Sequence, residues 1–439
     1  MRAWVTVGIL SLQANLSLAA DLPDAVTPSD FFPLDPEVVM LGRDLFFDPV
    51  LSGNRNIACA TCHHPSLASG DGVSLGLGEG GRDLGLNRRL DMATAPSHRI
   101  PRNAPALFNL GAREFGVMFH DGRVQTDKDA PFGIRMPDRA ALERPVPSAL
   151  AAQAMMPVTS AEEMAGHPGE NLIADLARDQ RFQGAGGVWD VLCKRVEAIP
   201  GYSTRFARII GPDRSLHFTD VARALAEFIA FEFRATATPF DAYLAGDATA
   251  LDAAQRHGMD LFYGPANCAS CHSGTFQTDH GFHAIGVPQL GPGKVADSAY
   301  DYGRGAVSGD DPDRYRFRTP SLRNVAKTAP YGHSGAFATL EGIVRHHLDP
   351  IRSLASYDPA EAVLPDLGGD TGDWAVLHDQ EELIRIAAAV EITPVTLSDT
   401  QVADILAFLD ALTDPRATTG RLGAPDSVPS GLPMDMIAR

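Results

Sequence analysis

The pattern Cys-x-x-Cys-His occurs twice in the chain, over residues 59–63 and over residues 268–272. This pattern is typical of c-type haem attachment, in which both thiols bond to the porphyrin and the histidine becomes an axial iron ligand. Paired cysteines also form zinc sites or disulfides, which remain the alternatives. The wide separation of the two pairs, each with a histidine directly attached, favours haem. The predicted haem-binding residues are Cys59, Cys62, His63, Cys268, Cys271 and His272.

Three other sequence features could be mistaken for functional residues or motifs. Cys193 lies among apolar residues, so we predict a buried small side chain and not a reactive thiol. His64, next to the first candidate ligand, is predicted to lie at the surface. The glycine pattern over residues 76–81 has the spacing of a dinucleotide-binding loop. It follows a haem motif instead of a strand, and no helix pattern begins on it, so we interpret it as a plain loop.

The composition limits the classes of function. The chain has 439 residues and a formal net charge of -18, which argues against nucleic acid or an anionic membrane as the main partner. Residues 1–20 combine one positive charge, an apolar run and small residues, which predicts a secretory signal peptide and a periplasmic location. No later stretch is long and apolar enough to predict a membrane span.

Similar segments recur in the same order along the chain. Residues 42–49 precede the first cysteine pair, and the similar residues 258–265 precede the second. Downstream, one Pro-x-Leu-x-Asn segment leads to His120-Asp-Gly and another leads to His333-Ser-Gly. An internal duplication is the simplest account. We expect domains over residues 21–210 and 211–413, followed by a flexible Pro- and Gly-rich tail over residues 414–439.

The clear secondary-structure signals are helical. An amphipathic pattern predicts a helix over residues 221–233, with Thr219 or Asp220 as its N-cap. Another helix should begin at Ser398. Alternating strand patterns are scarce, and long glycine- and proline-rich loops separate the helices. The predicted fold is therefore mostly α, with two cytochrome c-like haem domains and long loops.

With two haem motifs, a repeated plan and a signal peptide, the sequence resembles the bacterial di-haem cytochrome c peroxidases and their MauG relatives. The resemblance runs from about residue 33 to residue 412 and is specific over residues 318–325 and 397–409. It implies an oxidoreductase that reacts with hydrogen peroxide at the N-terminal haem while electrons pass through the C-terminal haem. The implied partners are a small periplasmic cytochrome or copper protein as electron donor, or a protein substrate.

The resemblance also assigns a distal pocket to the first haem. Glu163 and Gln153 fall on its distal positions. A carboxylate there can move a proton between the two oxygens of hydrogen peroxide, and an amide can supply a hydrogen bond. Judged from its neighbours alone, Glu163 is a solvated helix residue next to Glu162, and only the family resemblance reverses this interpretation.

Between the haems, the resemblance implies a calcium ion and an electron route. Asn103, Thr328 and Pro330 fall on the calcium-binding positions, where oxygen ligands are required. His120 stands where the family has a tryptophan. Either His120 replaces the indole in electron transfer, or the electrons take another route.

The second haem departs from the family pattern. His347 stands at its distal position, where the peroxidases have methionine and MauG has tyrosine. His346 is the alternative ligand, and a third reading leaves both histidines exposed. Methionine raises the potential of a haem relative to a nitrogen ligand, so we predict a six-coordinate, low-potential haem on His272 and His347. This slightly favours MauG-like oxidation of a partner side chain, for example tryptophan, over reduction of peroxide. A non-catalytic electron carrier is the third hypothesis.

Two segments near the first haem carry weaker expectations. Residues 126–148 are an insertion relative to the family, which we interpret as a lid or a partner-docking loop. His98 is either a loop residue or a distal ligand of the first haem in a resting state.

Overall fold

A computed structural model of the chain describes residues 22–91, 98–295, 298–367 and 371–436. The predicted signal peptide over residues 1–20 lies outside these described residues. Within them, no helix is both long enough and apolar enough to cross a membrane.

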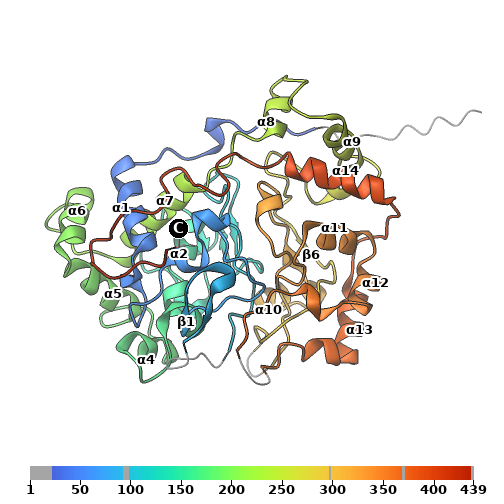
Figure 1. Ribbon diagram of the computed structural model, residues 1–439. Helices are drawn as coiled ribbons and strands as arrows, with labels where there is room; N and C mark the ends of the chain where they lie inside the picture. Colours follow the sequence, from blue (N-terminus) through green and yellow to red (C-terminus); the bar gives the residue numbers. More distant parts are fainter. Residues whose placement is uncertain (1–21, 92–97, 296–297, 368–370, 437–439) are drawn as a thin grey trace, which may run out of the picture.

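The fold is helix-rich, as predicted, and long loops connect the helices (Figure 1). The α-helices are α1 (Pro36–Phe47), α2 (Cys59–Cys62), α3 (Ala149–Ala154), α4 (Leu172–Arg178), α5 (Val188–Glu197), α6 (Pro200–Ile210), α7 (Phe218–Glu232), α8 (Pro239–Leu244), α9 (Ala253–Phe262), α10 (Gly305–Ser308), α11 (Leu340–Leu348), α12 (Pro350–Ala355), α13 (Gln380–Ala389) and α14 (Asp399–Asp410). The strands are short and antiparallel: β1 (Gly81–Arg82) with β2 (Arg89–Leu90), β3 (Val117–Met118) with β4 (Val124–Thr126) and β5 (Ile134–Arg135), and β6 (Phe282–His283) with β7 (Phe317–Arg318).

Each half of the molecule is built around a close crossing of two helices. In the first half α1 packs on α7, and in the second half α9 packs on α14 (Figure 1). A methyl group on Gly42 or on Gly258 would overlap a carbonyl oxygen of the partner helix. The Cβ atom of a phenylalanine, Phe228 or Phe408, lies beside the glycine in each crossing. Glycine therefore permits the two helix backbones to touch in both halves.

Local sequence signals fix the starts of two of these helices. α14 begins after Ser398, as predicted, and the Ser398 hydroxyl accepts a hydrogen bond from the Gln401 N–H at 3.3 Å. α7 begins at Phe218, earlier than predicted. The Asp220 carboxylate accepts from the His217 N–H at 3.0 Å, so Asp220 closes a capping box from inside the helix and is not itself the N-cap.

The boundary between the two cores lies later than residue 210. The buried side chains of α7 belong to the first core, which also includes Phe276, Ala417 and Val428. The second core takes Leu75 from the first half and otherwise consists of residues from Phe240 onward. The cores thus do not divide at residue 210, and the expected domains over residues 21–210 and 211–413 stay a prediction. α7 lies with the first core because it packs on α1.

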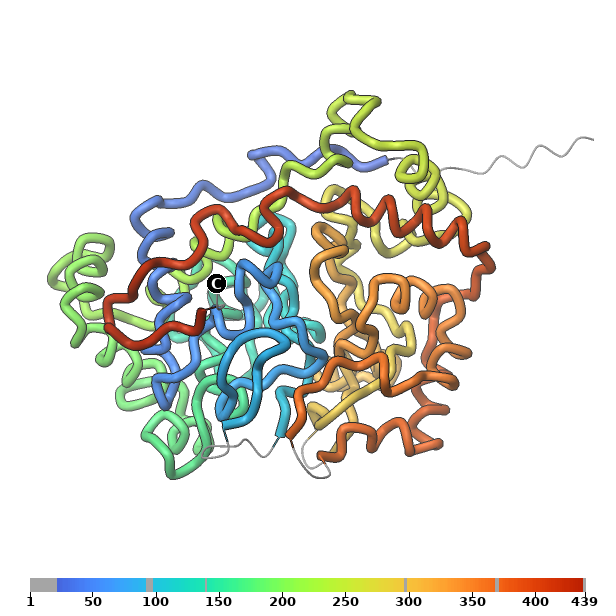
Figure 2. Tube along the Cα trace, in the orientation of Figure 1, coloured from blue at the N-terminus to red at the C-terminus, as the bar shows by residue number. Residues whose placement is uncertain are grey.

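The C-terminal tail is bound to the first half and is not flexible over residues 414–436, contrary to expectation (Figure 2). The buried Glu232 carboxylate accepts hydrogen bonds of 2.7 to 3.1 Å from the backbone N–H groups of residues 421–423. Near the end of the tail, Asp435 accepts a 2.8 Å hydrogen bond from the Thr61 hydroxyl, inside the first haem motif. A proline- and glycine-rich segment is extended, but its free N–H groups can satisfy buried carboxylates.

We predict that a chain ending at residue 418 has a thermal midpoint several degrees lower than the full chain. Glu232 would lose its backbone donors, and an unsatisfied buried acceptor costs about 1–3 kcal/mol. Differential scanning calorimetry of the holoprotein measures the change. The substitution Asp426→Asn, at an exposed position of the same tail, is the control and should leave the midpoint unchanged. Equal midpoints for the full and shortened chains would contradict a bound tail.

Candidate functional site

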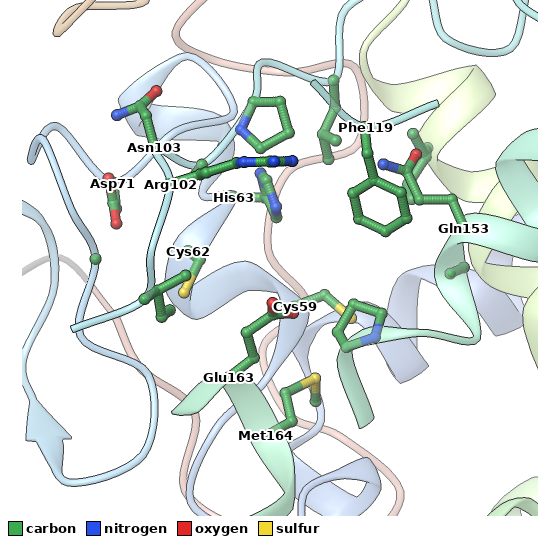
Figure 3. Close-up of a pocket in the computed structure, with 18 of the residues that line it drawn as sticks. Cys59, Cys62, His63, Asp71, Arg102, Asn103, Phe119, Gln153, Glu163 and Met164 are labelled. Carbon is green, nitrogen blue, oxygen red and sulfur yellow. The ribbon is translucent and has the colours of Figure 1, made fainter. Parts of the chain in front are cut away.

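The first cysteine pair opens onto a large cavity in the first half (Figure 3). Cys59, Cys62 and His63 line a cavity of about 1140 Å³, its opening included. α2 is a single helical turn, so it presents both thiols on one side. His63 donates from Nδ1 to the Ser69 carbonyl at 2.9 Å, which leaves Nε2 available for a metal ion. Burial lowers the pKa of His63 and favours the neutral form that binds metals.

The two predicted distal residues reach the same cavity from other segments. Glu163 lies on a π turn (Ala161–Ala165), Gln153 lies on α3, and both line the cavity with His63 (Figure 3). Gln153 is buried, and its Oε1 has no hydrogen-bond partner in the described part of the chain. An unsatisfied buried oxygen is costly, so its position indicates a polar ligand in the cavity.

The second cysteine pair lies against the second core, with two histidines facing each other. His272 follows the 3₁₀ turn Cys268–Ser270, and His347 lies on α11. Their ring centres are 6.4 Å apart. A histidine nitrogen lies about 2 Å from a bound metal ion. Two rings on opposite sides of one ion therefore have centres roughly 6 Å apart, in agreement with the observed spacing.

Backbone carbonyls orient both of these rings. His272 donates from Nδ1 to the Gln277 carbonyl at 3.2 Å, and His347 donates from Nδ1 to the Ile343 carbonyl at 2.8 Å. Each Nε2 is left for a metal ion. Burial lowers the pKa of His272 to about 4 and also lowers that of His347, so both rings are neutral. The residues therefore fit a haem with two histidine ligands.

The alternative ligand, His346, is engaged elsewhere. Its Nδ1 bonds to the Ser353 hydroxyl at 3.0 Å and its Nε2 bonds to the Ile285 carbonyl at 2.7 Å. Both nitrogens are occupied and the side chain is fully buried. The geometry therefore favours His347 over His346 as the ligand, which stays a prediction, and the reading with both histidines exposed is wrong.

The alternative of a shared zinc site does not fit the arrangement. Cys59 packs against the first core and Cys268 packs against the second. The two cysteine pairs therefore belong to separate sites, each with its own histidine. A four-ligand zinc site would need the pairs to converge.

His120 lies where the two halves meet. It lines the first cavity, and its Nε2 donates to the Asn103 carbonyl at 3.1 Å. Its own carbonyl accepts from the N–H of Arg318, on β7 of the second half, at 2.7 Å. Burial lowers the pKa of His120 to about 4, and the nearby Arg102 adds to this effect. His120 is therefore a neutral ring between the halves, and its role in electron transfer stays a prediction.

A buried ion cluster surrounds this junction. Arg102 binds Asp121 at 2.6 Å and Asp301 of the second half at 2.7 Å. Burial alone would raise the pKa of Asp121, but Arg123 and Arg102 outweigh it and hold the pKa below its usual value. Burial would also raise the pKa of Asp301, but Arg102 outweighs this effect and lowers the pKa below its usual value. Both carboxylates are thus charged and fix the two halves to each other.

Two of the three predicted calcium residues meet at a smaller cavity of about 200 Å³. Asn103 and Thr328 line it together with Ala329, and Pro330 follows Ala329 but does not line the cavity. Asp71 also lines it, and Figure 3 shows Asp71 and Asn103 on the same side of the first cavity. The oxygen-rich lining fits a hard cation.

Asp71 is a residue that the sequence interpretation missed. It is 2% exposed, it lines both cavities, and its Oδ2 has no partner within the described residues. Burial raises the pKa of Asp71 to about 7. The available signal was an Asp71-Gly72 pair in a loop, which by itself is typical of a turn.

Lys294 was also missed. It belongs to the second half, yet it lines the first cavity with Arg102 and Arg123. The residue keeps part of its surface exposed to solvent. A cavity with apolar walls and cations at one edge fits a porphyrin with its carboxylates. No pattern in the sequence predicts that Lys294, which follows the second cysteine pair, lies at the first haem.

Four remaining expectations have mixed outcomes. Cys193 is 3% exposed, which confirms a buried small side chain. His64 is 4% exposed, so the prediction of a surface position is wrong; its ring packs edge-on against Phe47. His98 is exposed. The 126–148 insertion is anchored by four buried side chains of the first core, Ile134, Met136, Ala140 and Leu142.

Comparisons with known proteins agree with this arrangement. Residues 36–249 match the family model of the di-haem cytochrome c peroxidases. The chain is 30% identical over 402 residues to the methylamine utilization protein MauG of Methylorubrum extorquens, covering 90% of this chain and 84% of that protein. It is 26% identical over 417 residues to the cytochrome-c peroxidase IdrP1 of a Pseudomonas strain, covering 90% and 85%.

The fold is similar to that of a MauG-like protein associated with microbial copper homeostasis. The TM-score is 0.59 at 24% identity, and the match covers 93% of this chain and 97% of that one. At this identity the likeness shows the fold alone. The sequence matches show more, because a relative at 30% identity aligns over most of both chains. The chain therefore belongs to the di-haem cytochrome c peroxidase and MauG family of oxidoreductases.

Proposed function

We propose that this chain is a periplasmic enzyme that reacts with hydrogen peroxide at its first haem and passes electrons through its second. The observation that carries the proposal is the contrast between the two distal sides. The first is a cavity that holds Glu163 and Gln153, whereas His347 faces His272 at the second. Peroxide needs an open coordination position, so it can react only at the first site.

The side chains around the first cavity suit this reaction. Haem iron, when bound, supplies the redox chemistry that breaks the O–O bond. Glu163 takes the proton of one peroxide oxygen and returns it to the departing oxygen. The Gln153 amide hydrogen-bonds to the peroxide and holds it in place. Two electrons and two protons then convert one peroxide to two waters, with a small periplasmic cytochrome or copper protein as electron donor.

We also infer that the two halves arose by internal duplication, with one haem in each. The two helix crossings support this inference. Gly42 and Phe228 of the first crossing have the same relation as Gly258 and Phe408 of the second, with 2.9 Å from the position of an added methyl to the phenylalanine Cβ in both. A packing detail of this kind depends on matched residues in both helices of each pair.

A second candidate function is MauG-like oxidation of a side chain, such as tryptophan, on a partner protein. A nitrogen ligand at His347 favours it, because a low-potential second haem gives up an electron more readily than a methionine-ligated one. Rapid consumption of peroxide with a reduced small cytochrome would support peroxide reduction. A persistent oxidised state without such turnover would support the second candidate.

The proposal includes one calcium ion at the smaller cavity. Asn103 and Thr328 would hold it through oxygen atoms, with Pro330 contributing from the adjoining segment. The Asp71 carboxylate lines the same cavity, and its Oδ2, which has no partner among the described residues, would be a further oxygen ligand. This arrangement would join the first haem motif to the second half.

The first prediction from the proposed function concerns the second haem. The oxidised protein should show one high-spin and one low-spin haem by electron paramagnetic resonance. His347→Ala should convert the low-spin signal to high spin, because the iron loses its distal nitrogen. His346→Ala is the matched control and should leave the signal low-spin, since the His346 nitrogens bond to Ser353 and Ile285. The reverse result would assign the ligand to His346.

The second prediction concerns proton transfer. Glu163→Gln should slow the reaction with peroxide by about 10²–10⁴-fold, the usual contribution of a general acid–base group, with both haems still attached. Stopped-flow spectroscopy measures the rate, and mass spectrometry measures haem content. Glu162→Gln changes a neighbouring residue that does not line the cavity and should have little effect. An unchanged rate in Glu163→Gln would rule out the acid–base role.

The third prediction concerns calcium. Adding calcium to chelator-treated protein should raise its thermal midpoint, because an ion that binds only the folded state stabilises it. Asn103→Ala should remove most of this increase. Lys128→Ala, which replaces an exposed cation outside both cavities, should keep it. The proposal fails if calcium leaves the midpoint of the unaltered protein unchanged.

A further inference from the structure

The π turn that carries Glu163 is held from behind by the glycine-rich loop over residues 76–81. A methyl group on Gly78 would overlap the Glu162 carbonyl oxygen and lie 2.6 Å from that of Glu163. The next residue, Glu79, donates from its N–H to the Glu162 carbonyl at 3.0 Å. Loop backbone therefore touches turn backbone directly, and only glycine allows this approach.

The Glu79 side chain ties this contact to the first haem motif. It is 1% exposed, and its Oε2 accepts hydrogen bonds from the side-chain amides of Asn54 at 3.2 Å and Asn56 at 2.9 Å. Asn56 lies shortly before Cys59 in the chain. Charged acceptors form the stronger hydrogen bonds. A continuous set of bonds thus leads from the haem-attachment segment through Glu79 to the turn of Glu163.

The same segment also holds the other side of the turn. The Gly53 N–H donates to the Met164 carbonyl at 2.7 Å. The carbonyls of both residues that flank Glu163 are therefore bound by groups outside the turn. The loop is in turn braced by Arg88, which is 3% exposed and donates to the Gly78 carbonyl at 2.7 Å.

The turn needs this external support. The π turn (Ala161–Ala165) is a single wide turn, and one turn of helix is not stable by itself. Isolated π turns occur mostly at functional sites, where they place a side chain that a regular helix would direct elsewhere. The direction of the Glu163 side chain therefore depends on what the turn is attached to.

We propose that Gly78 and Glu79 are positioning residues that fix the Glu163 carboxylate relative to the first haem-attachment segment. The proposal rests on the acid–base role of Glu163 in the proposed function. The glycine pattern over residues 76–81 then has a purpose that is unrelated to nucleotide binding. Gly78 permits the close approach, and Glu79 anchors it to Asn54 and Asn56.

The test is a double-mutant cycle on the full-length holoprotein. Gly78→Ala should slow the reaction with hydrogen peroxide roughly 10- to 100-fold, because a displacement of about 1 Å is enough for a loss of that size. In the Glu163→Gln background the same change should alter the rate less than about twofold, since the displaced carboxylate is already absent. Haem content and the low-spin signal of the second haem should be unchanged in all variants.

A second variant covers the case in which Gly78→Ala does not fold. Glu79→Gln replaces the charged acceptor of Asn54 and Asn56 and should slow the reaction several-fold. Glu170→Gln is its matched control: Glu170 also accepts from Asn54, at 2.8 Å, but it is exposed and does not line the cavity. Its rate should stay within about twofold of the unaltered protein.

Three outcomes separate the claims. If Glu163→Gln is slow but Gly78→Ala and Glu79→Gln react at the normal rate, the positioning role is wrong and the proposed function stands. If the loop variants slow the reaction equally with and without Glu163, they act through something else and the positioning role is again wrong. If Glu163→Gln reacts at the normal rate, the acid–base role of Glu163 is wrong, and the positioning role loses its basis.

Discussion

A buried guanidinium holds the two halves of this molecule together beside the first haem cavity. Arg102 binds Asp121 of the first half and Asp301 of the second, and all three side chains are buried. Loss of one member would leave a buried charge uncompensated, at a cost of about 3–5 kcal/mol. The next residue, Asn103, lines the smaller cavity, and its carbonyl accepts from His120. The haem cavity, the proposed cation site and the junction of the halves therefore depend on one dipeptide.

Around this junction, two copies of one attachment pattern produce two different metal environments. The attachment segments are alike, and in each a histidine donates from Nδ1 to a backbone carbonyl. The difference arises on the distal side. A regular helix, α11, directs His347 at His272, while a single π turn leaves Glu163 at the edge of a cavity. In the proposed function the first site therefore reacts with the small oxidant and the second transfers electrons.

The tail and the glycine loop show how composition can mislead. Both segments are rich in glycine and lack helical periodicity, and both look like connections. In the structure the tail supplies N–H donors to the buried Glu232, and the loop places Gly78 against the turn of Glu163. Extended backbone carries unpaired donors along its whole length, so it can satisfy buried acceptors that a helix could not reach.

The sequence by itself determined what depends on neighbouring residues: the two Cys-x-x-Cys-His patterns that predict haem attachment at Cys59 and Cys268, the start of α14 at Ser398, and the helix-rich class. The family resemblance added Glu163 and Gln153, which the structure brings to one cavity. Only the tertiary structure decided between His346 and His347, because the choice depends on hydrogen bonds to Ile285 and Ser353 from other parts of the fold. It also revealed Asp71 and Lys294, because a buried carboxylate oxygen without a partner and a lysine at the cavity of the other half arise only when distant segments meet.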